Sequence, residues 1–164
     1  MSALVAGFGN IFLSDDGLGA AVIRLLAQVD LGGDVRVRDF GTGGMHLALE
    51  MLNGYDRVIL VDAVSRDDPP GTVFAIDCTQ DDVSSGTPPD AHAMTIDAAL
   101  SLYRTLRDRS GAARKPQIIV VGCVPQSLAE GMELSEPVRA ALPACVDLVS
   151  TLTHVPIGRG AATS

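Results

Sequence analysis

The chain has 164 residues and a mass of 17.0 kDa, a size typical of a single domain. A hydrophobic content of 47% excludes a disordered or fibrous protein, and a net charge of −8 argues against partners such as nucleic acid or anionic membranes. No apolar stretch approaches the ~20 residues that span a bilayer, so we predict a soluble protein.

Predicted strands and helices alternate along the first sixty residues. The apolar run at 4–6 is typical of a buried strand, and apolar residues then recur at helical spacing from Leu18 to Val29. The alternation at 34–40 favours an edge strand, and residues 45–52 a short helix. The β-branched run at 58–61 is typical of a central parallel strand. This β-α-β-α-β order predicts half of a doubly wound α/β fold.

The second half of the chain breaks this alternation. Only eight residues lie between Ala63 and Thr72, too few for the dozen or more that a parallel crossover needs. We therefore expect an antiparallel strand at 72–76, followed by a long polar loop at 77–91. A third helix near Ile96, a buried strand at 118–121 and a last helix capped by Ser135 complete the pattern.

Domain limits and compartment follow from composition. Residues 1–155 are expected to form one α/β domain, and the tail at 156–164, rich in Gly, Ala and Ser, is expected to be flexible. Three cysteines without a CxxC pair, and no visible signal peptide, favour a cytoplasmic protein with reduced thiols.

Two carboxylates are expected to meet at one crevice of the sheet. In open α/β sheets, ligands bind beyond the carboxyl ends of the strands, where the strand order reverses. If the first strand is central and the second and third flank it, Asp16 and Asp62 lie together there. Two such carboxylates can share a proton or bind a cation.

These acids also have structural readings. Either Asp15 or Asp16 can cap the helix that follows, although only one residue can be its N-cap and the other carboxylate then stays spare. Asp62 can serve as a hydrogen-bonding group, but it follows four apolar residues of a buried strand, where an unpaired charge is costly. A functional site is the favoured reading.

A nucleotide cofactor is not expected. The start Gly7-Phe8-Gly9 resembles a dinucleotide fingerprint, but Phe12 stands where its third glycine belongs, and the acids before the first helix would repel a pyrophosphate. His92 ends the long polar loop and is the histidine best placed to join Asp16 and Asp62. One imidazole with two carboxylates suits a borderline divalent ion; a plain helix-terminus role remains the alternative.

A glycine-rich segment follows the second predicted strand. Gly41, Thr42 and Gly43 permit a close backbone approach, so they are candidates for clamping an extended peptide substrate. A simple turn before a helix explains them equally well.

Taken in order, these motifs resemble the nickel–iron hydrogenase maturation endopeptidases. The resemblance spans residues 3 to about 153 and is specific as a set rather than piece by piece. Its segments are Leu4-Val5-Ala6-Gly7-Phe8-Gly9-Asn10, Ser14-Asp15-Asp16-Gly17-Leu18-Gly19, Asp39-Phe40-Gly41-Thr42-Gly43-Gly44-Met45, Val61-Asp62-Ala63, His92, Gly122-Cys123-Val124-Pro125-Gln126-Ser127 and Leu134-Ser135-Glu136-Pro137-Val138.

The resemblance implies a fold, a substrate and a metal. The expected fold is a three-layer α/β/α sandwich around a five-stranded, mainly parallel mixed sheet with one antiparallel strand. The expected activity removes a C-terminal extension from the precursor of the hydrogenase large subunit after nickel insertion. Asp16, Asp62 and His92 would contact nickel carried by that substrate. Asp16 stands where some members have Glu, and Phe40 replaces the first glycine of the family's Asp-Gly-Gly-Thr loop.

For the reaction we expect an aspartic-type hydrolysis by a monomer. Asp16 or Asp62 would act as the base that activates water, with Asp39 as a further candidate. Two other functions stay open at this level: a nickel-dependent checkpoint that binds the precursor without cutting it, and a small-molecule hydrolase with paired carboxylates.

Overall fold

The structure, a computed structural model, describes residues 1–80, 95–111 and 114–157. These residues form five strands, one short 3-10 helix and four α-helices. In chain order they are β1 (Ala3–Gly7), η1 (Ser14–Gly17), α1 (Leu18–Leu26), β2 (Val35–Asp39), α2 (Gly44–Met51), β3 (Arg57–Ala63), β4 (Val73–Asp77), α3 (Ile96–Ser110), β5 (Gln117–Cys123) and α4 (Glu136–His154).

The strands form one mixed sheet in the order β2-β1-β3-β5-β4. The first four strands of this order run parallel, and β4 pairs antiparallel with β5 at the edge. The predicted antiparallel strand is therefore confirmed. It pairs with β5, which is inserted between β3 and β4, rather than with the strand that precedes it in the chain.

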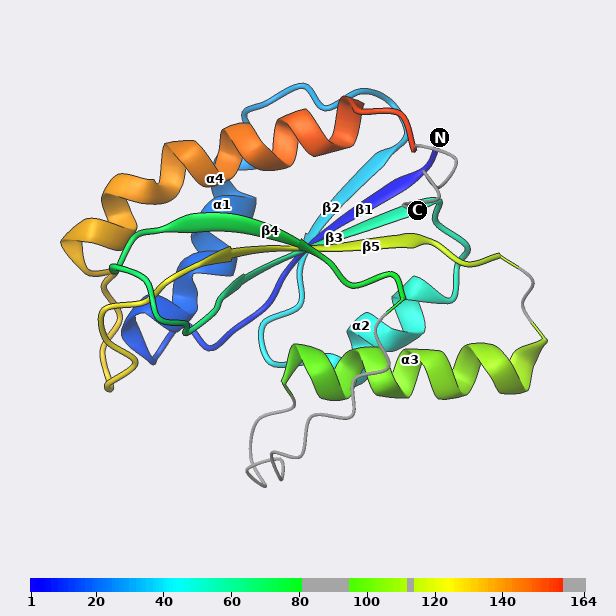
Figure 1. Cartoon of the computed structure of the whole chain (residues 1–164), viewed down its shortest axis with the longest axis horizontal. Helices are drawn as coiled ribbons and strands as arrows, with labels where there is room; N and C mark the ends of the chain where they lie inside the picture. The colour runs from blue at the N-terminus through cyan, green and yellow to red at the C-terminus, as the bar shows by residue number, and fades with distance from the viewer. Residues whose placement is uncertain (81–94, 112–113, 158–164) are drawn as a thin grey trace, which may run out of the picture.

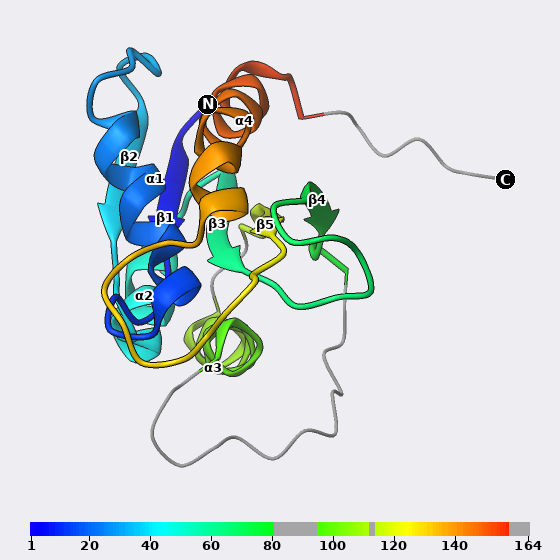
Figure 2. The same cartoon turned by 90° about the vertical axis from the view of Figure 1, so that its left-hand side faces the viewer.

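Helices cover both faces of the sheet, which confirms the three-layer α/β/α sandwich (Figures 1 and 2). On one face α2 and α3 pack against even-numbered residues of β1 and β3, such as Leu4 and Leu60. On the other face α1 and α4 pack against odd-numbered residues, such as Val5 and Ile59. The alternation of side chains along each strand divides the apolar residues between two cores.

The remaining expectations concern the cysteines, membrane-spanning helices and the C-terminal tail. Cys123 and Cys145 are buried and form no disulfide, and Cys78 is half-buried. In the described part of the chain, none of the helices is long and apolar enough to cross a membrane. The predicted flexible tail falls mostly on residues 158–164, which lie outside the described residues, so it stays a prediction.

Candidate functional site

The predicted crevice lies beyond the carboxyl ends of β1 and β3. These strands are neighbours at the centre of the sheet, with Gly7 level with Val61, and the Phe8 N–H donates to the Val61 carbonyl over 3.0 Å. The chain passes from β1 outward to β2 and then crosses to β3 on the other side, so the strand order reverses here. Asp62 follows Val61 directly and lies at this point.

A sharp turn after β1 brings Asp16 to the same end of the sheet. Gly9 has φ +131, and a Cβ there would lie 2.1 Å from the backbone oxygen of Asp16, so no other residue fits. The Asn10 N–H then donates to the Asp16 carboxylate over 2.8 Å. Gly19 allows α1 to begin against the backbone of Phe8 and Val61. Glycines therefore determine where the Asp16 carboxylate lies.

Asp62 is the least satisfied acid among the described residues. Its Oδ1 is buried and has no hydrogen-bond partner there. Burial, and then the nearby negative charge of Asp16, raise its pKa to about 8. At neutral pH the folded protein therefore holds a proton on Asp62, or needs a cation to replace it. The electrostatic effect of Asp16 on Asp62 agrees with the predicted pairing of these two carboxylates.

Asp15 has a role that the sequence left open. It is fully buried and accepts hydrogen bonds from Gln126 N (2.8 Å), Ser127 N (3.0 Å), Ser135 N (2.7 Å) and Ser135 Oγ (2.8 Å). Burial alone would raise its pKa, but these bonds, led by that of Ser135 N–H, hold the pKa below its ordinary value. Asp15 thus ties the loop before α4 to the loop that carries Asp16.

Two expected helix caps are absent for this reason. The N-cap of α1 is Gly17, without a side-chain cap, so neither Asp15 nor Asp16 fills that role. Ser135 does occupy the N-cap position of α4, but its hydroxyl donates to Asp15 and makes no cap bond. The contact between Asp15 and the loop before α4 had only a weak signal in the sequence. That signal was the pair of acids Asp15 and Asp16 before one helix and the distant Ser135 before another.

Backbone contacts strengthen the junction between the two loops. Ser14 has a left-handed backbone with φ 51, a conformation that costs of order 1 kcal/mol for a residue other than glycine. Its N–H donates to the Gly131 carbonyl over 2.8 Å, and its hydroxyl donates to the Ala129 carbonyl over 2.7 Å. The strained residue directly precedes Asp15, so the junction holds this part of the site in one geometry.

The glycine-rich segment after β2 lies against the turn that precedes Asp16. Gly9 N–H donates to the Gly41 carbonyl over 2.8 Å, and Gly41 has φ +55. Asp39 ends β2 and accepts from Gly41 N–H over 3.1 Å. In the described portion of the chain, no hydrogen bond or ion pair joins Asp39 to Asp16 or Asp62. Its catalytic role therefore stays a prediction, as does substrate binding by Gly41, Thr42 and Gly43.

The third predicted metal ligand, His92, lies outside the described residues, so the full trio is not tested. Within the residues that are described, no group of three His, Cys, Asp or Glu side chains is close enough to hold a metal ion. His46 and His154 are both exposed. The described chain resumes at Thr95, which lines the same cavity as Asp62.

Comparisons with known proteins agree with this arrangement. The family model for hydrogenase maturation proteases matches residues 20–152. The chain is 30% identical over 151 residues to the hydrogenase 2 maturation protease of Escherichia coli, covering 91% of this chain and 88% of that protein. It is 28% identical over 154 residues to the delta subunit of the coenzyme F420 hydrogenase of Methanothermobacter thermautotrophicus, covering 89% and 90% of the two chains.

Solved structures give the same grouping. A hydrogenase 2 maturation peptidase from a Thaumarchaeota archaeon superposes with a TM-score of 0.68 at 33% identity, covering 93% of this chain and 97% of that one. The hydrogenase maturating endopeptidase HybD of E. coli superposes with a TM-score of 0.67 at 28% identity, covering 91% and 90%.

Proposed function

Because this chain belongs to the hydrogenase maturation protease family, we propose that it removes the C-terminal extension of a nickel–iron hydrogenase large-subunit precursor after nickel insertion. The proposed substrate includes its own nickel ion. The protease recognises this ion and so cuts only a precursor whose metal centre is complete. Membership of the family makes the chain a peptidase. The precursor, the nickel and the aspartic-type chemistry are the parts that we propose.

One observation carries the proposal: the Oδ1 of Asp62, close to the charge of Asp16, is buried and has no partner among the described residues. A buried carboxyl group without a partner costs free energy, so a fold retains it where a ligand completes it. A cation is the ligand that reverses both causes of the raised pKa, because it compensates the loss of water and the repulsion from Asp16.

The site fits an ion that is held jointly by the protease and the precursor better than an ion that the protease binds alone. Two carboxylates supply only part of the coordination that a transition metal needs, and His92 would add an imidazole, a ligand suited to nickel. The remaining positions are left for ligands from the precursor. Such a site binds the ion firmly only when the precursor presents it, so cleavage would depend on nickel insertion.

The proposed reaction is hydrolysis of one peptide bond. Nickel binding displaces the proton from Asp62 and fixes the precursor next to both carboxylates. Asp16 or Asp62, with Asp39 as the further candidate, accepts a proton from water as its oxygen attacks the scissile carbonyl carbon. The C–N bond then breaks, and that proton passes to the leaving amine. The segment Gly41–Gly43 would pair with the extended substrate backbone.

The test measures loss of the C-terminal extension by mass spectrometry. Nickel-loaded and nickel-free precursor are each incubated with wild-type protein and with Asp16→Ala, Asp62→Ala and His92→Ala. We expect cleavage of the nickel-loaded form only, and a loss of at least about 100-fold in rate for each variant. The matched control is Asp56→Ala, which removes a carboxylate from the opposite end of the sheet and should leave cleavage unchanged.

Other outcomes would contradict the proposal in distinguishable ways. Full cleavage by all three variants would overturn the site assignment. Nickel-dependent binding of the precursor without loss of mass would identify a checkpoint protein. Inactivity toward both precursor forms, with hydrolysis of small esters or amides, would identify a small-molecule hydrolase.

A further inference from the structure

A cavity of about 280 Å³ lies directly beside Asp62. It is open to one side and is lined by the end of β3, by β5, by the edge strand β4 and by the first turn of α3. Its apolar walls include Val64, Ile76, Ile96 and Val120. For comparison, an apolar cavity of about 150 Å³ is enough to bind benzene, so this space can accept one large aliphatic or aromatic side chain.

Two observations indicate that a ligand completes this cavity. The wall formed by Asp62 includes the carboxyl group whose Oδ1 has no partner among the described residues. Ile76 lies on the edge strand and is 40% exposed, although the rest of the apolar wall is largely buried. The cavity thus combines apolar walls with one carboxyl group, which is the usual composition of a pocket that orients a bound group.

We propose that this cavity is a specificity subsite that receives one apolar side chain of the precursor next to the scissile bond. The inference rests on the proposed function, since it takes Asp62 as the place where the scissile bond lies. Successive side chains of an extended peptide point to opposite sides. A peptide held at Asp62 can therefore direct one residue beside the cut into the cavity while the next points away.

Charge adds a second element of selectivity. Asp97, in the first turn of α3, also lines the cavity, so acids stand on two of its sides. An Asp or Glu side chain of the substrate would lose its hydration in an apolar space and meet the like charge of Asp97. The subsite should therefore accept Leu, Ile, Met or Phe, bind Gly or Ala weakly and reject acidic residues.

The experiment varies the two precursor residues that flank the cut, one at a time, to Leu, Gly and Asp. At one of the two positions, wild-type protein should cut the Leu precursor roughly 100-fold faster than the Gly precursor in kcat/KM, with Asp slower still. The other position should show little preference. Equal rates for Leu, Gly and Asp at both positions would overturn the subsite.

Variants of the cavity wall give a second readout. Ile76→Ala enlarges the cavity at a half-exposed position and should move the preference from Leu toward Phe. Asp97→Asn should raise kcat/KM for the Asp precursor about tenfold. Unchanged preferences in both variants would contradict the proposal.

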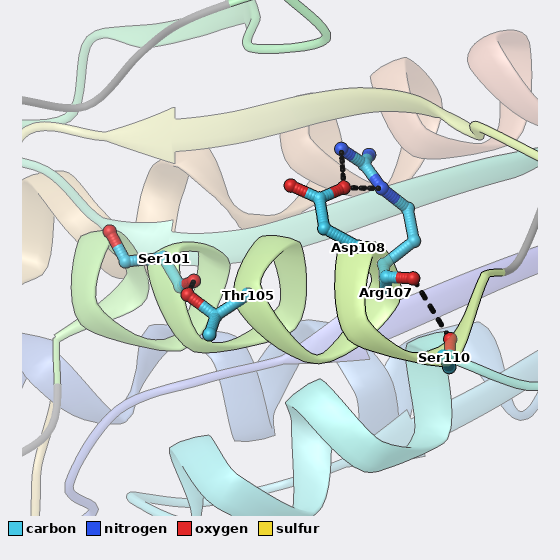
Figure 3. A network of polar contacts seen from close by, with 5 residues as sticks. All are labelled: Ser101, Thr105, Arg107, Asp108 and Ser110. Carbon is cyan, nitrogen blue, oxygen red and sulfur yellow. Dashed lines mark hydrogen bonds and ion pairs between the residues drawn. The ribbon is translucent and has the colours of Figure 1, made fainter.

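Matched controls lie on the same face of the fold. Asp108→Asn removes an exposed acid at the far end of α3, where Asp108 pairs with Arg107 over 3.1 Å (Figure 3). Leu49→Ala removes an exposed apolar side chain from α2, outside the cavity. Neither should alter the preference. Wild-type protein that cuts the unaltered nickel-loaded precursor supports the proposed function whatever the flanking residues do, whereas failure to cut it overturns both proposals.

Discussion

The charged side chains at the two ends of the central strands β1 and β3 differ in how completely they are paired with hydrogen-bond or ion-pair partners. At the amino ends of β1 and β3, Asp56 accepts from Ser2 N–H over 2.8 Å and pairs with Arg114 over 3.2 Å. Arg57, only 2% exposed, donates to Gln117 Oε1 over 2.8 Å, to the Val155 carbonyl over 2.7 Å and to the Leu152 carbonyl. This end therefore matches its charged groups with partners.

Near the carboxyl ends of the same strands, the buried Asp15 is fully matched with donors, whereas the half-buried Asp62 is matched only in part. Asp15 accepts four hydrogen bonds, whereas Asp62 leaves an oxygen without a partner in the described structure. Their pKa values move in opposite directions: that of Asp15 is lowered and that of Asp62 is raised to about 8. The fold thus provides partners for charged groups at both ends of these strands, and the exception at Asp62 among the described residues supports its place in the proposed site.

The largest expected effect is on stability and comes from Asp15→Ala. It leaves three backbone N–H groups and the Ser135 hydroxyl without their charged acceptor, so we expect a loss of about 4 kcal/mol in the free energy of unfolding. Because the loop that carries Asp16 also loosens, kcat/KM per folded molecule should fall at least about tenfold. Urea denaturation and precursor cleavage measure the two effects.

The control for Asp15→Ala is Asp56→Ala at the amino end. Asp56 is partly exposed and accepts from a single residue, so its loss should cost only about 1 kcal/mol and leave cleavage per folded molecule unchanged. Equal losses of activity in the two variants would show that the tether at Asp15 has no special connection to the site.

The second variant is Arg57→Met, which changes the amino ends of the strands, where the charged side chains have partners. It leaves the carbonyl groups at the end of α4 without their donor and removes a cation from the negative end of the helix dipole. We expect a loss of about 3 kcal/mol, with kcat/KM of the folded protein preserved. A fall in kcat/KM beyond the loss of folded protein would contradict the separation of the two ends.

The smallest expected effect comes from Asp62→Asn, and it raises the free energy of unfolding, whereas the other variants lower it. The folded pKa of about 8 lies above the ordinary value near 4, so between these values the folded protein binds more protons than the unfolded chain. Wild-type stability should therefore fall as the pH rises from 4 to 8, by at most about 1.4 kcal/mol per pH unit. The amide does not titrate, so Asp62→Asn should be about 2 kcal/mol more stable than wild type at pH 6.

Urea denaturation at several pH values, with a chelator present, measures this difference. The gain in stability should accompany a loss of cleavage, because the acid that lowers stability is also the one proposed to take part in the reaction. Parallel stability curves for the two proteins from pH 4 to 8 would refute the raised pKa of Asp62.

Much of the fold could be predicted because it depends on local patterns. The short link between Ala63 and Thr72 excluded a parallel crossover, and β4 is antiparallel to β5. The rule that ligands bind where the strand order reverses placed Asp62 and the turn before Asp16 at one crevice, and the structure agrees. These predictions needed only hydrophobic periodicity, connection length and the geometry of parallel sheets.

The partners of individual polar groups could not be predicted in this way. Ser135 lies in a good capping context, yet its hydroxyl bonds to Asp15, 120 positions away. Asp15 and Asp16 are adjacent and chemically identical in the sequence, but Asp15 is fully buried with four hydrogen bonds, whereas Asp16 is half-buried and accepts from Asn10 N–H. Such choices depend on which loops meet in three dimensions, and no local pattern contains that information.

By itself, then, the sequence determined the α/β class, the antiparallel direction of β4 and the end of the strands to which Asp16 and Asp62 belong, because these follow from periodicity and chain connectivity. Only the tertiary structure decided which acid is satisfied and which is not. Whether a carboxylate has a partner depends on the burial and the donors around its oxygen atoms, and segments distant in the chain supply both. One carboxyl oxygen of Asp62 is buried without a partner among the described residues, and its pKa is raised by that burial and by the charge of Asp16.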